Sequence, residues 1–146
     1  MGEANYYLKA RFVSEAEAEA ALPKFKEFLR QAGEVHNLWQ ADRMKPKPDF
    51  YEKIRAEFPI VYEYLKTLPG ALEADFDRLN GLAGLLSFGN VETEPEVVND
   101  EIRYWENTWH FGDWYPLCRF IESHFGAEAS AYISDEYADM FDCVHV

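Results

Sequence analysis

The feature that most restricts the fold is a short alternating segment followed at once by a helix signal. Within residues 5–13 apolar side chains occupy every second position, namely Tyr6, Leu8, Ala10 and Phe12. Lys9 and Arg11 fall on the opposite face. This period of two predicts a strand with one buried face. Ser14, with Glu17 three residues later, forms a capping box and predicts that a helix starts there.

The predicted first helix contains two residues that helices tolerate poorly. Pro23 lacks a backbone N–H, so we expect it to kink the helix or to restart it. Gly33 is expected just beyond the helix C-terminus. Glu34–Gln40 is then predicted to be a short strand, and Asp42–Pro48 an exposed loop.

Residues 42–82 are predicted to form a helical insertion. Asp49 is expected to cap a helix at its N-terminus. Proline fits the first turn of a helix but not its interior, so Pro59 predicts two short helices joined at Phe58. Apolar residues over 72–79 predict one more helical piece.

Strands dominate the second half of the predicted order. The strand candidates are Leu85–Val91, Glu101–Phe111, Glu128–Tyr137 and Met140–Val146. Glu92–Asp100 is predicted to be an acidic loop. Asp113 is expected to cap a helix that holds Pro116 in its first turn and ends at Gly126. In the longest strand, the face that carries Trp105, Trp109 and Phe111 is expected to pack against a helix.

These elements predict one α+β domain over residues 1–146. Its largely antiparallel sheet is covered by helices. A ferredoxin-like βαββαβ core with the helical insertion accounts for the order of elements.

Charge is distributed unevenly along the chain, whose formal net charge is −13. The second half, residues 74–146, holds 3 basic and 15 acidic side chains. Aromatic residues make up 16% of the chain, which excludes an acidic disordered chain. Such a charge disfavours duplex nucleic acid and anionic lipid as partners and favours a basic protein.

No apolar stretch long enough for a membrane span and no secretory signal is found, so we expect a cytoplasmic protein. Cys118 and Cys143 are interpreted as two buried thiols in a reducing compartment, although the sequence leaves a disulfide between them open. We expect no cofactor.

The acidic residues form the principal candidate site. Its expected partner-binding residues are Glu92, Glu94, Glu96, Asp100, Glu101, Asp135, Glu136, Asp139 and Asp142. A cation held near residues 135–142 is an alternative, because carboxylates are ligands for hard cations. The spacing matches no EF-hand loop. A solvated hairpin whose charges prevent aggregation is the simplest interpretation.

Aromatic residues form a second candidate site. A pocket between the insertion and the sheet would be lined by Tyr62, Trp109, His110 and Tyr115. His110 beside Cys118 is a conceivable nucleophilic pair, but a thiol on the apolar side of a helix is usually inert. The histidine spacing contains no zinc motif. Base stacking on the aromatics would need more cations than Arg103 and Arg119 supply.

A basic cluster is found in the first half of the chain. It consists of Arg43, Lys45, Lys47, Lys53 and Arg55. It gives the chain a dipole that a second copy would complement, but a solvated loop is the simpler interpretation.

The C-terminal third resembles a known family. The pattern consists of Trp109–Trp114, a helix over Tyr115–Phe125, a strand over Ala129–Tyr137 and a return through Phe141. It resembles the closing part of Api92-like ferredoxin-fold proteins of phages and plasmids over about 40 residues. The tryptophan-rich Asn-Trp-Gly motif of that family is not matched. The resemblance implies a mobile-element protein and carries over no site residue.

No catalytic motif is present, so the leading hypothesis is a non-enzymatic acidic protein that engages or inhibits a basic protein. A ligand-binding domain or enzyme built around Trp109 and His110 is the second hypothesis. A structural subunit of an assembly, including a homo-oligomer, is the third.

Overall fold

The structure is a computed structural model that describes residues 4–41, 48–68, 94–108 and 115–134. Its helices and strands, in chain order, are β1 (Ala4–Arg11), α1 (Glu15–Ala41), α2 (Pro48–Glu57), α3 (Pro59–Lys66), β2 (Glu96–Val98), β3 (Glu101–Thr108), α5 (Tyr115–Phe125) and β4 (Glu128–Ser134). The predicted α+β class is confirmed.

The described strands form one sheet with the order β2-β3-β1-β4. Each neighbouring pair is antiparallel, and β1 lies between β3 and β4. β3 and β4 therefore run in the same direction on either side of β1, with α5 between them in the chain. β2 and β3 form a hairpin with the two-residue turn Asn99–Asp100.

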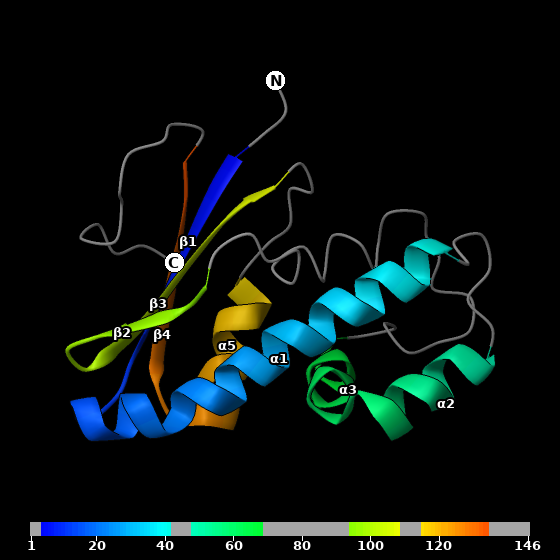
Figure 1. The fold of residues 1–146 in the computed structure, drawn as a ribbon, viewed down its shortest axis with the longest axis horizontal. Helices are drawn as coiled ribbons and strands as arrows, with labels where there is room; N and C mark the ends of the chain where they lie inside the picture. Colours follow the sequence, from blue (N-terminus) through cyan, green and yellow to red (C-terminus); the bar gives the residue numbers. More distant parts are fainter. Residues whose placement is uncertain (1–3, 42–47, 69–93, 109–114, 135–146) are drawn as a thin grey trace.

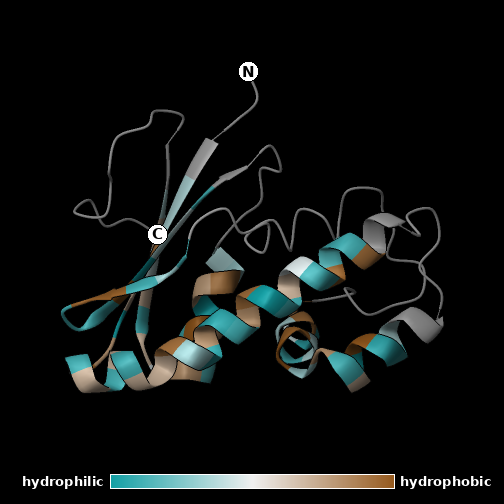
Figure 2. Cartoon of the chain, viewed as in Figure 1, coloured by the Kyte–Doolittle hydropathy of each residue, from teal (hydrophilic) through white to brown (hydrophobic). Residues whose placement is uncertain are grey.

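Helices α1 and α5 lie on the same side of the sheet (Figure 1). The first half of α1 crosses the sheet, α3 packs beside its second half, and α2 packs against α3. Figure 2 shows that the outward surface of α1 is mostly hydrophilic, whereas α3 and α5 are richer in apolar residues. This pattern is that of a helix buried along one stripe.

Three aromatic rings join α1, α3 and α5 in the core. The ring of Phe28 lies 5.2 Å from that of Phe120 and 5.9 Å from that of Tyr64. The rings of Tyr64 and Phe120 are 5.4 Å apart. All three side chains are at most 4% exposed. These contacts anchor the insertion to the helix layer that covers the sheet.

The predicted break in the first helix is wrong, since α1 continues from Glu15 to Ala41 through both Pro23 and Gly33. Pro23 lies on the exposed side, where water can satisfy the carbonyl oxygen that its missing N–H leaves without a partner. The apolar stripe also continues past Gly33, because Val35 is fully buried. The short strand predicted over Glu34–Gln40 is therefore helix.

The helix start and the division of the insertion are confirmed. The backbone N–H of Glu17 donates to Ser14 Oγ at 3.2 Å. Helices α2 and α3 meet at Phe58, with Pro59 as the first residue of α3. The cap predicted at Asp49 is wrong, because α2 already begins at Pro48.

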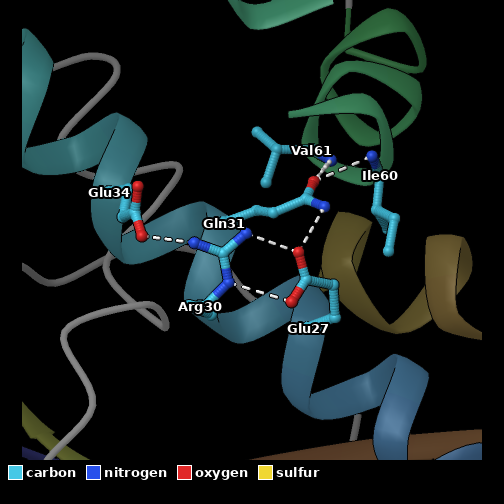
Figure 3. A network of polar contacts seen from close by, with 6 residues as sticks. All are labelled: Glu27, Arg30, Gln31, Glu34, Ile60 and Val61. Atoms are coloured by element: carbon cyan, nitrogen blue, oxygen red, sulfur yellow. Dashed lines mark hydrogen bonds and ion pairs between the residues drawn. The ribbon is translucent and has the colours of Figure 1, made fainter. Parts of the chain in front are cut away.

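A side chain from α1 caps the N-terminus of α3. Gln31 Oε1 accepts hydrogen bonds from the backbone N–H groups of Ile60, at 2.9 Å, and Val61, at 3.3 Å (Figure 3). Gln31 Nε2 donates to Glu27 Oε2 at 3.0 Å, and Arg30 Nε donates to Glu27 Oε1 at 2.9 Å. Phe58, at the usual cap position, has no side-chain oxygen to take this role.

The two faces of β3 are reversed relative to the prediction. Ile102 and Tyr104, each 1% exposed, face the helices, because they stand opposite Ala10 and Leu8 of β1. Trp105 faces the other way and is 36% exposed.

Residues 96–98 of the predicted acidic loop are strand β2. The turn that follows places Asn99 at φ 58°, a left-handed conformation that asparagine tolerates well.

The last described elements agree with the sequence. Pro116 lies in the first turn of α5, and Gly126 ends the helix with φ +72°. β4 occupies the first part of the predicted strand over Glu128–Tyr137. Five predictions lie outside the described residues, namely the loop over Asp42–Pro48 except for Pro48 itself, the helical piece over 72–79, the strands Leu85–Val91 and Met140–Val146, and the cap at Asp113.

Candidate functional site

Four of the nine predicted acidic partner-binding residues are described. They lie at the β2–β3 hairpin and are Glu94, Glu96, Asp100 and Glu101. The other five lie outside the described residues and are Glu92, Asp135, Glu136, Asp139 and Asp142.

Glu94 and Glu96 project from the outer strand of the described sheet and from the residues just before it. The Glu94 side chain is 79% exposed and lies 3.7 Å from Lys26 Nζ of α1. Beside it, Lys26, Arg30 and Pro95 help to line a hollow of about 410 Å³. Such an exposed ion pair contributes little to stability, so Glu94 remains accessible to another molecule.

Glu101 starts a strand as predicted, but it is not the exposed partner-binding residue that was expected. It begins β3, is 7% exposed, and is surrounded by three cations. Arg103 Nε donates to Glu101 Oε1 at 2.9 Å. Lys9 Nζ and Arg11 Nε each lie 3.8 Å from Glu101 Oε2. The carboxylate thus bridges cations of β1 and β3 and is not available to a partner.

This cluster was not predicted, although part of its signal lies in the sequence. The alternation in β1 places Lys9 and Arg11 together on the polar face. The alternation does not give the strand register, which sets Lys9 opposite Arg103 and Arg11 opposite Glu101. Register depends on pairing between distant segments, which one sequence does not specify.

A second hollow of about 410 Å³ opens beside the cluster. Its lining residues are Lys9, Arg11, Glu101, Glu122, Glu128, Ala129 and Ser130. Glu122 is held in place by Arg119, at 2.9 Å, and by the backbone N–H of Ala129, at 3.1 Å. The hollow therefore combines cationic donors with carboxylate acceptors.

Only two of the four residues of the predicted aromatic pocket are described. Tyr62 lies on α3, where Lys66 Nζ is 5.6 Å from the centre of its ring. Tyr115 begins α5, is 52% exposed, and has the Arg119 guanidinium 4.9 Å from its ring centre. Trp109 and His110 lie outside the described residues, so the pocket stays a prediction.

The described cysteine and histidines take part in packing. Cys118 is fully buried on α5, as predicted, and Cys143 lies outside the described residues. His124 stacks on Phe120, with ring centres 4.7 Å apart. Burial lowers the pKa of His124, and Lys24 adds to the effect while Glu63 opposes it.

In the described part of the chain, His, Cys, Asp and Glu side chains form no group of three that could hold a metal ion. No helix described there is both long and apolar enough to cross a membrane.

Compared with known proteins, the chain matches no protein-family model, no curated protein and no solved structure.

Proposed function

We propose that the chain is a non-enzymatic binding protein that engages a basic protein partner through the acidic residues at β2. The observation that carries this proposal is the placement of Glu96 on the outer strand β2 and of Glu94 just before it, where both side chains are exposed. The hollow beside Glu94 gives room for a side chain of the partner.

The overall charge supports the same proposal. A field from a net charge of −13 steers a cationic partner toward the chain and raises its association rate. Glu92, Asp135, Glu136, Asp139 and Asp142 extend the proposed surface along the chain. Glu101 is left out, because its carboxylate is already bound to cations of the sheet.

Affinity capture with two double variants tests the proposal. A partner from cells that make the protein should bind wild type at low salt and leave as salt rises toward about 0.5 M, where the Debye length is only a few ångströms. Glu94→Gln/Glu96→Gln should lose this partner. Glu15→Gln/Glu19→Gln removes the same charge from exposed positions of α1 and should retain it. Equal capture by both double variants, or no salt-sensitive partner, would contradict the proposal.

We also propose the ferredoxin-like βαββαβ class for the core. Support comes from the sheet order β2-β3-β1-β4 and from the position of α5 between two strands of the same direction. Helices α2 and α3 precede β2 in the chain, within the insertion predicted over residues 42–82. Paired cysteines at Leu8 and Ala131, which face each other in the register, should form a disulfide if this order is correct.

We also propose that the C-terminal third resembles Api92-like proteins. It is supported by a helix over Tyr115–Phe125 followed by a strand that starts at Glu128.

A further inference from the structure

Strand β2 lies at one edge of the described sheet (Figure 1). It pairs with β3 on one side, and no described strand pairs with its other side. In an antiparallel pair, the main-chain N–H and C=O groups of successive residues point alternately toward the partner strand and away from it. The residues of β2 that point outward therefore decide what this edge can bind.

One hydrogen bond fixes this alternation. The N–H of Phe12 donates to the carbonyl oxygen of Asp100 at 2.8 Å, just beyond the last paired residues of β1 and β3. Asp100 therefore points toward β1, and Ile102 does the same, because the directions repeat every two residues. Ile102 stands opposite Val97 in the register with β2. The pair exchanges no hydrogen bond, so the main-chain N–H and C=O of Val97 point away from the sheet.

The two main-chain groups of Val97 are therefore available to another chain. Among the described residues, none forms a hydrogen bond with either group. One residue of an added strand can accept from the N–H and donate to the C=O. Addition of a strand at a sheet edge is a general way to bind an extended peptide.

The charge beside this edge selects the added strand. Glu96 is exposed and stands opposite Arg103. The Arg103 guanidinium is already bound by Glu101, with its Nε and Nη2 each 2.9 Å from Oε1, so the Glu96 carboxylate stays accessible. A second copy of this chain is disfavoured as the added strand, because its carboxylates and its net charge of −13 would repel the first copy.

A hollow of about 410 Å³ adjoins the start of β2. One wall comes from α1 and the other from Glu94 and Pro95, the two residues before β2. Pro23, Leu29 and Pro95 give it apolar surface. The aliphatic stem of a long basic side chain can pack on such surface while its charged end stays near water.

The charged residues of the hollow form ion pairs of unequal strength. Arg30 Nε donates to Glu27 Oε1 at 2.9 Å, and Arg30 also binds Glu34. Lys26 Nζ lies 3.7 Å from Glu94 Oε1, which is too long for a hydrogen bond, and the two side chains are 47% and 79% exposed. A guanidinium from another molecule can replace Lys26 at Glu94, because it binds a carboxylate through two parallel hydrogen bonds.

We propose that a strand of the basic partner is added to β2, where it pairs with Val97 and places two consecutive basic residues near Glu96 and Glu94. Successive side chains of a strand point to opposite faces of the sheet. The first basic residue therefore lies beside Glu96 on the face turned away from α1, and the second enters the hollow beside α1. This inference rests on the proposed function and specifies how the partner binds.

Titration with a peptide tests strand addition directly. The probe is acetyl-Thr-Val-Thr-Arg-Arg-Thr-Val-amide, added at low salt to the full chain and followed by NMR. In the free chain, the Val97 amide should exchange with solvent faster than the Val98 amide, which is bonded to β3. The peptide should slow exchange at Val97 and shift its resonance. The same peptide with N-methylated amides keeps its charge but cannot donate, so it should bind at least about tenfold more weakly.

Two variants separate main-chain pairing from side-chain packing. Val97→Pro removes the outward N–H and leaves the hydrogen bonds to β3 in place, as proline does on edge strands. It should weaken peptide binding by at least about tenfold. Val97→Ala also loses the half-buried valine side chain but keeps the N–H, so it should bind like wild type. If Val97→Pro does not fold, the N-methylated peptide still tests the pairing.

Several results would overturn the added strand. Absence of peptide binding at about 1 mM would do so, as would equal binding of the two peptides or equal binding by wild type and Val97→Pro. The capture experiment with Glu94→Gln/Glu96→Gln tests the acidic surface separately. If that double variant loses the partner and Val97→Pro retains it, the acidic surface is supported and the added strand is excluded.

Discussion

Replacing Gln31 with leucine is expected to lower the free energy of unfolding by about 2 kcal/mol, although the substitution adds an apolar side chain to a buried position. Gln31 is 3% exposed, and its Oε1 accepts from the first two N–H groups available in α3 (Figure 3). Pro59 has no N–H, so Ile60 and Val61 provide these donors. Leucine would leave both without this acceptor.

The magnitude follows from the burial of the two donors. Val61 is fully buried, and a buried donor without a partner costs about 1–3 kcal/mol. Ile60 is half-buried, so water can partly replace its lost acceptor and the cost there is smaller. The apolar surface gained by leucine offsets part of the sum. The estimate matches the upper end of measured N-cap losses, about 0.5–2 kcal/mol.

Urea denaturation followed by circular dichroism gives the stability difference, and amide hydrogen exchange locates it. Exchange at the Ile60 and Val61 amides should accelerate more than exchange at β1. Asn37→Leu provides the control, because Asn37 is an exposed residue of the same helix and its replacement should stay within about 0.5 kcal/mol of wild type. Gln31→Glu keeps an acceptor but faces the Glu27 carboxylate, so it should fall between wild type and leucine.

One pair of results would refute this reasoning. If Gln31→Leu unfolds at the wild-type urea concentration and leaves the two amide exchange rates unchanged, the side chain does not cap α3. Equal losses for Gln31→Leu and Asn37→Leu would instead assign the effect to leucine on α1 in general.

Three further predictions concern charged groups. The Arg30 guanidinium lowers the pKa of Glu27 to about 2. Stability from this carboxylate should be complete above its ordinary pKa of 4.5 and lost as the pH falls through about 2. Glu27→Gln should therefore unfold more easily than wild type near pH 7, by about 1 kcal/mol or less in this exposed setting, and equally near pH 2. The pKa of His124, read from an NMR titration, should lie below 6.5, so its protonation should destabilise the fold as the pH drops; a value above 6.5 would contradict the burial argument. Glu101→Gln leaves three cations without their carboxylate and should cost about 1–3 kcal/mol in urea unfolding, with a smaller loss when Arg103→Gln is already present.

The helical layer shows where sequence patterns predict well and where they fail. Pro59 divided α2 from α3 as expected, because a proline at the first helical position needs no tertiary support. Pro23 and Gly33 are also unfavourable inside a helix, yet α1 continues through both. Burial of Val35 in the core outweighs a local penalty of about 1 kcal/mol for glycine, and this burial exists only in the packed tertiary structure.

For the candidate sites, too, the sequence predicts the environment of some residues and not of others. Exposure of Glu94 and Glu96 could be predicted, because acidic residues beside a proline favour a surface position. The role of Glu101 could not, since it depends on strand pairing. Period-two spacing predicts that the face with Trp105 is buried, but the core positions of β3 are Ile102 and Tyr104.

Local signals in the sequence therefore determined the strand–helix opening, the positions of several helix ends and the α+β class. The periodicity and capping chemistry behind them act over a few residues. The tertiary structure alone decided the register of β1 with β3 and β4. A shift of one residue would exchange the two faces of a strand. Through that register the tertiary structure brings Lys9, Arg11 and Arg103 around the Glu101 carboxylate, on the sheet face that also carries the exposed Trp105.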